Sequence, residues 1–390
     1  MAYTHRLFNS IDAVDLTAWQ QVRSACGDPV FIDPRFIAAV EAGMKQIYRF
    51  WYVIIYDDGR PVACTSFAAI TADLADFADP GLARIIRHVP PALSKLRRLK
   101  LLICGLPVGT GHHTLALAQR AASREVIAVL DRVTADLAAK LKMDAIVYKE
   151  FGQDDLEWTQ PLVDLGYRRI PIPPMHCFKP VFEDFAHYCA ALKTRYRQQV
   201  NRSTRKLQRA GITPSVLSNP DEILRVYTPA VHGLYHQMAA RANLKLETLP
   251  IELLQELTRQ LKDQVDLVLL SKDSRIVAFG WCLHAGSGYH MLYAGLDYDL
   301  NREFDLYFNL MYAGLDRAFR KRVSKVEVGI SADAFKARIG CYSEPLYVFA
   351  KGLGPVLSLI VRAAGNLLVV QRPATTPSDI FRSDIAENSK

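Results

Sequence analysis

Two stretches of the chain, FWYVIIYDDGRPVACTSFAAI at residues 50–70 and VDLVLLSKDSRIVAFGWCLHA at residues 265–285, follow one pattern. Each consists of two apolar runs separated by a short polar turn, which is Asp57-Asp58-Gly59-Arg60 in the first and Lys272-Asp273-Ser274-Arg275 in the second. Apolar runs that flank such a turn predict a β-hairpin. We therefore expect one hairpin in each half of the chain.

The elements around the two hairpins are expected in the same order. Two helices precede each hairpin, and a strand, a helix and a further strand follow it. We place the following elements at 99–104, 124–141 and 144–148 in the first half and at 288–294, 305–319 and 325–329 in the second. This repetition predicts an α/β protein built from two copies of one unit.

Composition and length agree with a two-domain globular protein. The chain has 390 residues, of which 50% are hydrophobic and 23% are charged, and this excludes disordered, collagenous and disulfide-scaffold classes. We expect a first domain at 1–180, a second domain at 181–372 that begins with a basic helix near 185–210, and a disordered tail at 373–390.

The positive charge is concentrated in a few segments. The net charge is +8, and residues 185–220 contain seven basic side chains and no acid. Such a field suits nucleic acid, an anionic membrane surface or a phosphate-bearing cofactor. We interpret the basic helix as facing phosphate, with its basic side chains spread around the helix. Two apolar and basic stretches, 82–105 and 351–372, suit attachment to anionic lipid, or burial in the second core or against a dimer partner.

Cysteine usage and hydropathy bear on localisation. The seven cysteines form no CxxC pair, which is typical of reduced thiols in a cytosol, and no metal site is expected. We find no secretory signal and no run with the character of a spanning helix. The expected localisation is cytoplasmic, with peripheral association at the inner face of the cytoplasmic membrane as an alternative.

The order of elements resembles the GNAT acyltransferase unit, and two such units in tandem resemble the FemAB-like branch of that superfamily, including the bacterial ceramide synthase-like N-acyltransferases. Tyr293–Asp297, Val326–Gly329 and Phe335–Gly340 look like the second domain of this branch. Leu102–Gly105 with Gly109–His113 is similar to a loop in relatives that act on acyl thioesters. The resemblance implies two tandem GNAT-like domains, each a mixed, mostly antiparallel sheet flanked by helices, with acyl-CoA as co-substrate and no metal.

The glycine-bearing loop of the first half is the expected acyl-CoA site. Glycines after a strand let backbone N–H groups face phosphate, and the next helix adds its positive N-terminal end. The residues expected to contact the cofactor are Gly105, Gly109, Thr110, Gly111 and His112. The second half has no Q/R-x-x-G-x-G/A loop between Ala294 and Asp305. An ordinary turn-rich connection is the alternative reading of the first loop.

Catalysis of amide formation needs a base for the amine, an oxyanion site and an acid for the leaving thiolate. We expect His113 or Glu150 to act as the base and Tyr293 to act as the acid or oxyanion donor. His290 and Tyr293 are three residues apart, so a regular strand without a bulge would place them on opposite faces. A loop histidine, a solvated strand-end charge and a packed tyrosine are the structural alternatives.

Four basic residues are expected to bind substrate. Lys336 and Arg338 are two positions apart, so they would share one face of an extended segment and suit an anionic group. Lys149 follows the strand at 144–148, and Arg195 lies in the basic helix. An ordinary basic loop and a solvated helix are the corresponding structural readings.

Three functions remain open at this point. The first is an N-acyltransferase of the type that transfers groups other than aminoacyl groups, from acyl-CoA to an amine; a lipid-like or sphingoid amine at a membrane surface is one such acceptor. The second is aminoacyl transfer from charged tRNA to a peptidoglycan precursor, the one case in which we expect a nucleic-acid partner. The third is a degenerate, non-catalytic GNAT-like protein that binds lipid or a partner protein.

Overall fold

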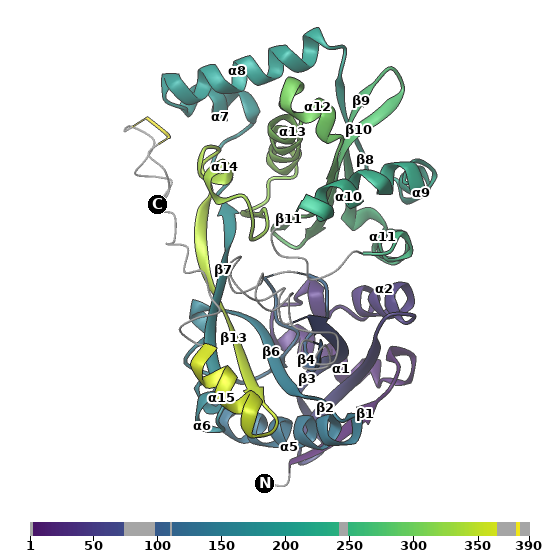
Figure 1. The fold of residues 1–390 in the computed structure, drawn as a ribbon, viewed down its shortest axis with the longest axis vertical. Coiled ribbons are helices and arrows are strands. Elements are labelled where there is room, and N and C mark those ends of the chain that lie inside the picture. Colours follow the sequence, from purple (N-terminus) through teal and green to yellow (C-terminus); the bar gives the residue numbers. More distant parts are fainter. Residues whose placement is uncertain (1–2, 74–97, 110, 242–248, 365–379, 383–390) are drawn as a thin grey trace. The chain divides into compact units, whose positions relative to one another are not determined.

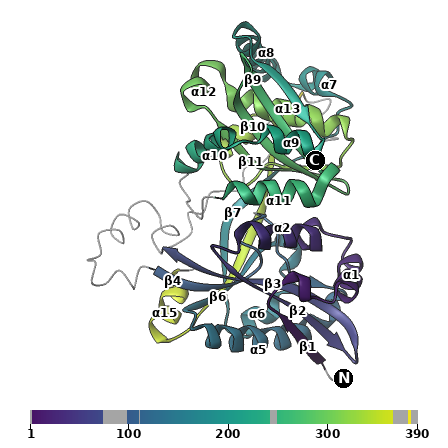
Figure 2. The same ribbon diagram turned by 90° about the vertical axis from the view of Figure 1, so that its right-hand side faces the viewer.

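The chain folds into two compact units, shown in Figures 1 and 2. The computed structural model describes residues 3–73, 98–109, 111–241, 249–364 and 380–382. Unit 1 consists of Met1–Pro173 and Pro345–Arg372, and unit 2 of Pro174–Glu344 and Pro373–Lys390. The division therefore falls before residue 180, and 345–372 belong to unit 1 and not, as the sequence analysis expected, to the second domain.

Unit 1 is built on a mixed sheet. Its strands run in the order β1 (Tyr3–Phe8), β2 (Arg49–Asp57), β3 (Arg60–Asp73), β4 (Arg98–Cys104), β6 (Ala145–Gly152) and β13 (Tyr342–Gly352), and the short β5 (Ala116–Leu117) pairs with β3. Only β4 and β6 are parallel within this set, and the other pairs are antiparallel. The hairpin predicted at residues 50–70 is confirmed as β2 and β3.

The helices of unit 1 are α1 (Leu16–Ala25), α2 (Pro34–Met44), α5 (Ser123–Leu141), α6 (Gln160–Asp164) and α15 (Pro355–Ala364). In α5 the residues Val126, Leu130, Val133 and Leu137 recur at helical spacing and are buried. They pack into a core with Phe67 and other apolar side chains of the sheet. The helix ends at Leu141, and the next residue, Lys142, caps it in the left-handed conformation.

Unit 2 repeats this arrangement. Its strands run in the order β7 (Arg168–Phe178), β12 (Lys325–Glu327), β11 (Gly288–Leu296), β10 (Arg275–Ala285), β9 (Val265–Lys272) and β8 (Thr213–Leu217). Here β11 and β12 are the parallel pair, as β4 and β6 are in unit 1. Both units contain a hairpin, a strand, a long helix and a parallel strand in that order, which confirms the predicted repeat.

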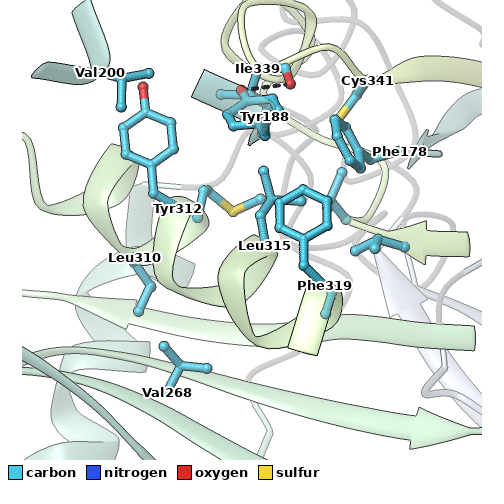
Figure 3. Close-up of a cluster of buried hydrophobic side chains, with 14 of the residues drawn as sticks. Phe178, Tyr188, Val200, Val268, Leu310, Tyr312, Leu315, Phe319, Ile339 and Cys341 are labelled. Carbon is cyan, nitrogen blue, oxygen red and sulfur yellow. Dashed lines mark hydrogen bonds between the residues drawn. The ribbon is translucent and has the colours of Figure 1, made fainter. Parts of the chain in front are cut away.

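The helices of unit 2 cover both faces of its sheet. They are α7 (Phe185–Ala191), α8 (Thr194–Arg209), α9 (Pro220–Val226), α10 (Pro229–Arg241), α11 (Ile251–Leu261), α12 (Tyr298–Phe304), α13 (Leu306–Arg320) and α14 (Asp333–Ala337). On one face, α13 packs its Leu315 and Phe319 against Phe178 and Tyr188, as Figure 3 shows. The single basic helix expected at 185–210 is two helices, because Leu192 and Lys193 have extended backbone.

Each unit is completed by a strand from the other half of the sequence. In unit 1, β6 pairs with β13, which follows all other strands of the chain. In unit 2, β12 pairs with β7, which precedes the first helix of that unit. The two repeats therefore exchange their last strands.

Residues 380–382 correct the expectation of a disordered tail. Phe381 forms a β-bridge with Leu192, and the Lys193 N–H donates to the Ile380 carbonyl at 2.8 Å. Ile380 and Phe381 are buried in the core of unit 2, because two large apolar side chains gain more from packing there than from solvation. The apolar and basic stretches at 82–97 and 365–372 lie outside the described residues. Among the helices that the structure describes, none has the length and hydropathy to cross a bilayer.

Candidate functional site

The loop that follows β4 in unit 1 is held in place by Lys149 and Glu150. The Lys149 Nζ donates to the carbonyls of Leu106 at 2.8 Å and Val108 at 3.2 Å. The Glu150 Oε2 accepts a hydrogen bond of 2.5 Å from the Gly111 N–H. Glu150 has a φ of +62°, a strained value for a side chain that is not glycine, and its carboxylate is buried. Both side chains therefore anchor the loop.

This anchoring argues against the expected phosphate cradle. Three N–H groups of the loop donate within the protein: Gly105 to the Ser66 carbonyl, Gly111 to Glu150, and His112 to the Gly109 carbonyl. A phosphate at Gly111 would have to displace a carboxylate, which has the same sign of charge. Thr110 lies outside the described residues.

Aromatic packing fixes the rest of the loop. The His112 imidazole stacks on the Phe31 ring, with centroids 3.9 Å apart and an interplanar angle of 18°. Gly109 has a φ of +73°, and a Cβ there would lie 2.6 Å from the Phe31 ring. The glycine is thus required by the close approach of Phe31. Gly105 is required for a similar reason, because a Cβ there would lie 2.6 Å from the Lys149 Cγ.

His113 forms an imidazole–carboxylate pair with Asp155 in unit 1. Its Nε2 lies 3.5 Å from the Asp155 Oδ2, and its ring stacks on Phe151. Burial would raise the pKa of Asp155, but hydrogen bonds from His113, from the Trp158 indole and from the Gly152 N–H, together with the charge of His113, lower it to about 2. The buried Nδ1 of His113 has no hydrogen-bond partner in the described part of the chain.

A second imidazole–carboxylate pair lies in unit 2. The His290 Nδ1 is 2.8 Å from the Glu327 Oε2, and the two side chains are only 10% and 11% exposed. Lys325 neutralises the same carboxylate, with its Nζ 3.3 Å from the Glu327 Oε1. This hydrogen bond assigns the proton of the neutral imidazole to Nδ1, which leaves a lone pair on Nε2.

The position of this pair follows from the strand pairing. His290 and Glu327 are the last of three paired positions in the parallel ladder between β11 and β12. β12 ends at Glu327, whereas β11 continues to Leu296. The pair therefore lies where the parallel ladder ends, at the carboxyl end of β12 and near the start of β11.

A β-bulge brings Tyr293 to the face of His290. Trp281 pairs with Tyr293 and Cys282 with Met291, so Leu292 is an extra residue in β11. Tyr293 contacts Trp281, whose indole N–H donates to the Thr258 hydroxyl on α11. Tyr289 and Met291 lie on the opposite face of the sheet, which packs against α13. The sequence analysis placed the two on opposite faces of a strand without a bulge; the bulge adds one residue and puts them on the same face.

Gly288 leaves space beside the Nε2 of His290. An ideal Cβ at Gly288 would lie 3.1 Å from the His290 Nε2 and 3.4 Å from the Ala285 carbonyl oxygen. Any side chain at this position would crowd the nitrogen that carries the lone pair. Gly288 has no positive φ, so its role is to leave space and not to permit a special backbone conformation.

The expected arrangement of Lys336 and Arg338 is wrong because their segment is helical and not extended. Lys336 lies in α14, is buried, and donates from Nζ to the Gly329 carbonyl at 2.8 Å. Burial lowers the pKa of Lys336 to about 8. Arg338 is exposed and donates to the Gln199 side chain. The two side chains therefore do not share a face.

His176 links α14 to its surroundings. Its Nε2 lies 3.0 Å from the Asp333 Oδ1, and its Nδ1 lies 3.1 Å from the Ser343 Oγ. The His176 N–H donates to the Gly329 carbonyl, which also accepts from Lys336. This buried cluster positions Lys336.

Arg195, a further expected substrate-binding residue, is exposed on α8, with its guanidinium over the Tyr196 ring.

Sequence reasoning missed the carboxylate partners of both histidines. Glu327 interrupts the apolar run Val326-Glu327-Val328, and a charge inside a short strand is a signal of a buried pair. Asp155 carries no comparable signal, since it lies in the acidic segment Asp154-Asp155-Leu156-Glu157.

Comparison with known proteins gives a family match within the second unit. The family described as Acetyltransferase (GNAT) domain matches residues 194–337. No curated protein matches the chain in sequence.

Several solved structures share the fold of the whole chain. FemX matches with a TM-score of 0.57 and 14% identity, covering 93% of this chain and 100% of FemX. A tandem GNAT protein from the clavulanic acid biosynthesis pathway matches with a TM-score of 0.53 and 11% identity, covering 90% of this chain and 99% of the other.

The C-terminal domain of a putative lysylphosphatidylglycerol synthetase from Agrobacterium fabrum matches with a TM-score of 0.50 and 10% identity, covering 88% of this chain and 96% of the other. These likenesses agree with the expected mixed sheets flanked by helices. Residues 194–337 match an acetyltransferase (GNAT) domain, and the chain as a whole shares the fold of FemX and of a tandem GNAT protein.

Proposed function

We propose that the protein is an N-acyltransferase that moves an acyl group from acyl-CoA to an amine, with His290 as the general base. The observation that carries this proposal is the buried His290–Glu327 pair, 2.8 Å apart, inside the GNAT domain. GNAT domains generally use acyl-CoA, and a paired imidazole is suited to take a proton from an attacking amine.

The location of the pair supports a substrate site beside it. In open α/β sheets, ligands bind outside the carboxyl ends of parallel strands, where neighbouring strands part. The ladder between β11 and β12 ends at His290 and Glu327, and β11 then continues alone on that side among the described residues. An acyl thioester bound there would present its carbonyl carbon to an amine next to the imidazole.

Each residue then has one task. The amine gives a proton to the His290 Nε2, and the Glu327 carboxylate stabilises the imidazolium that forms. The amine nitrogen attacks the thioester carbonyl, the C–N bond forms and the C–S bond breaks. Tyr293, on the same face of β11, donates a proton to the thiolate of CoA.

The first unit contributes less to this proposal. Glu150 is engaged by the Gly111 N–H and by Lys149, whose Nζ lies 3.4 Å from its Oε2, so it is a poor base for an incoming amine. His113 keeps a buried nitrogen and an ordered carboxylate partner. It is the alternative base, acting at a site on unit 1.

A second candidate function is aminoacyl transfer from charged tRNA. It is favoured by the likeness to FemX over nearly the whole of both chains and by that to the domain of a putative lysylphosphatidylglycerol synthetase. The chemistry at His290 would be the same, because an aminoacyl ester is also attacked by an amine or hydroxyl group. Only the donor would differ.

The test measures release of free CoA thiol from acetyl-, octanoyl- and palmitoyl-CoA in the presence of an amine panel that includes sphinganine. We expect His290→Gln to lower turnover by about 10²–10⁴-fold. His187→Gln is the matched control, because His187 is an exposed histidine of the same unit. Equal turnover in the wild type and in folded His290→Gln would remove the assigned base.

A parallel assay follows transfer of a radiolabelled amino acid from charged tRNA to a peptidoglycan precursor or to phosphatidylglycerol. Activity in this assay alone would replace acyl-CoA by aminoacyl-tRNA as the donor. Inactivity in both assays would favour a non-catalytic binding protein.

A further inference from the structure

One face of α8 is an arginine face. Four of its arginines are exposed: Arg195, Arg202, Arg205 and Arg209. At about 100° per residue they lie within an arc of about 80°, and at 1.5 Å per residue they extend over about 21 Å of the helix. In Figure 1, α8 lies along the edge of unit 2. The four exposed arginines thus share one face, whereas the sequence analysis described the basic side chains as spread around the helix.

The opposite face of α8 fixes this orientation. Val200, Ser203 and Leu207 are buried, and Val200 and Leu207 belong to the core of unit 2. The Ser203 Oγ donates to the Asp305 Oδ2 at 2.8 Å, and Lys206 forms an ion pair with the same carboxylate. Rotation of the helix would break these contacts, so they hold the arginines on the exposed side of the helix.

The rest of the exposed surface of α8 is neutral. Its other exposed residues are Thr194, Gln198, Asn201 and Gln208, and the helix contains no acid. Within the described residues, no carboxylate lies within ion-pair distance of the four exposed guanidinium groups. The described residues therefore leave the charge of this face uncompensated.

We infer that the arginine face binds the phosphate headgroups of an anionic lipid bilayer. Guanidinium groups bind phosphate oxygens through paired hydrogen bonds, and anionic lipids attract basic helices. The exposed residues of α8 include no large apolar side chain, so the helix rests on the headgroups and does not insert. Binding is therefore electrostatic.

The arc of the arginines favours a bilayer over a nucleic acid. A helix in a nucleic-acid groove meets phosphates on both flanks, whereas these four arginines face one plane. Single-stranded RNA is held by stacking on exposed aromatic rings, and the only aromatic residue of α8, Tyr196, is half-buried and lies beside the Arg195 guanidinium. A flat, anionic surface can contact all four arginines at the same time.

The test is sedimentation of the full chain with phosphatidylcholine vesicles and with vesicles that also contain phosphatidylglycerol. We expect binding only to the anionic vesicles and a loss of binding as salt is raised. Each arginine contributes about fivefold to partitioning, so replacing all four by glutamine lowers it by several hundredfold. Tm values verify that the variant is folded.

The matched control removes the same charge elsewhere. Lys45, Arg60, Lys140 and Arg168 are exposed residues of unit 1, and their replacement by glutamine also lowers the net charge by four. We expect the control to keep most of the anionic binding. Equal losses in both variants would show an effect of net charge alone and overturn the inference.

Two further results would overturn it. One is binding to both kinds of vesicle with equal strength. The other is no binding to anionic vesicles together with salt-sensitive binding of bulk tRNA that the arginine variant loses, which would reassign the face to RNA. Because the readout is binding and not turnover, this test is independent of the proposed reaction.

Discussion

The His290 Nδ1 lies 2.8 Å from the Glu327 Oε2 at the point where the parallel pairing of β11 with β12 ends. The carboxylate does not face the substrate in our proposal. It is a positioning residue that selects the tautomer of His290 and stabilises its charged form. This role can be separated from a purely structural one.

Glu327→Gln should lower kcat by about 10²–10³-fold with little change in KM, because the amide removes the charge that stabilises the imidazolium. The change in pH dependence of kcat is the readout that a structural role would not produce. Glu344→Gln is the control, since Glu344 also pairs with Lys325 but does not contact His290. An unaltered kcat and pH profile in Glu327→Gln would contradict the assignment.

Gly288→Ala should lower kcat by about tenfold. The new methyl group would lie 3.1 Å from the His290 Nε2, so the imidazole must tilt away from the position in which it accepts a proton. Gly233→Ala is the matched control, because a Cβ at Gly233 would meet no atom within 4 Å. Steady-state kinetics and Tm measure both variants, and equal kcat values would exclude crowding of the base.

Lys336→Met should raise the free energy of unfolding by about 2 kcal/mol at pH 7, since it removes a buried charge. Burial lowers the pKa of Lys336 from 10.5 in the unfolded chain to about 8. Between these values the unfolded state binds a proton that the folded state does not, so the stability contributed by Lys336 rises with pH.

The stabilising effect of Lys336→Met is therefore largest below pH 8 and shrinks toward pH 10.5. Urea unfolding of the wild type and of Lys336→Met across this pH range measures the difference in their unfolding free energies. The titration of other groups cancels in this difference. If the difference in unfolding free energy does not change with pH, the pKa of Lys336 is not lowered in the folded protein.

Ile380→Ala should lower the free energy of unfolding by about 2–4 kcal/mol, because Ile380 is completely buried in unit 2. Arg382→Ala is the control, since Arg382 is the exposed neighbour of this segment. Urea or thermal unfolding measures the stability of the two variants. Equal stabilities of wild type and Ile380→Ala would restore the expectation of an unstructured tail.

Sequence periodicity predicted the repeated elements because these depend on local patterns. The two hairpins, the helix Ser123–Leu141 and the strand Ala145–Gly152 all form where the apolar spacing indicated them. By contrast, the pairing of β13 with β6 joins segments that are distant in the sequence, and no local pattern encodes such a partner.

The candidate site was harder to predict for the same reason. The extra residue Leu292 exists only relative to the pairing of β11 with β10, so its effect on Tyr293 is invisible in the sequence. Lys336 was expected in an extended segment, and burial of this lysine depends on contacts with Gly329 and on the position of α14. His290 was noticed, but its partner Glu327 comes from a strand beyond the intervening helix.

The exchange of β7 and β13 has a consequence for synthesis on the ribosome. The edge of β6 stays open until residue 352 has left the exit tunnel, by which time nearly all of unit 2 has been made. An open strand edge is a site of wrong pairing between nascent chains. The first repeat therefore cannot finish folding before the second, and the order of translation is not the order in which the native sheets are completed.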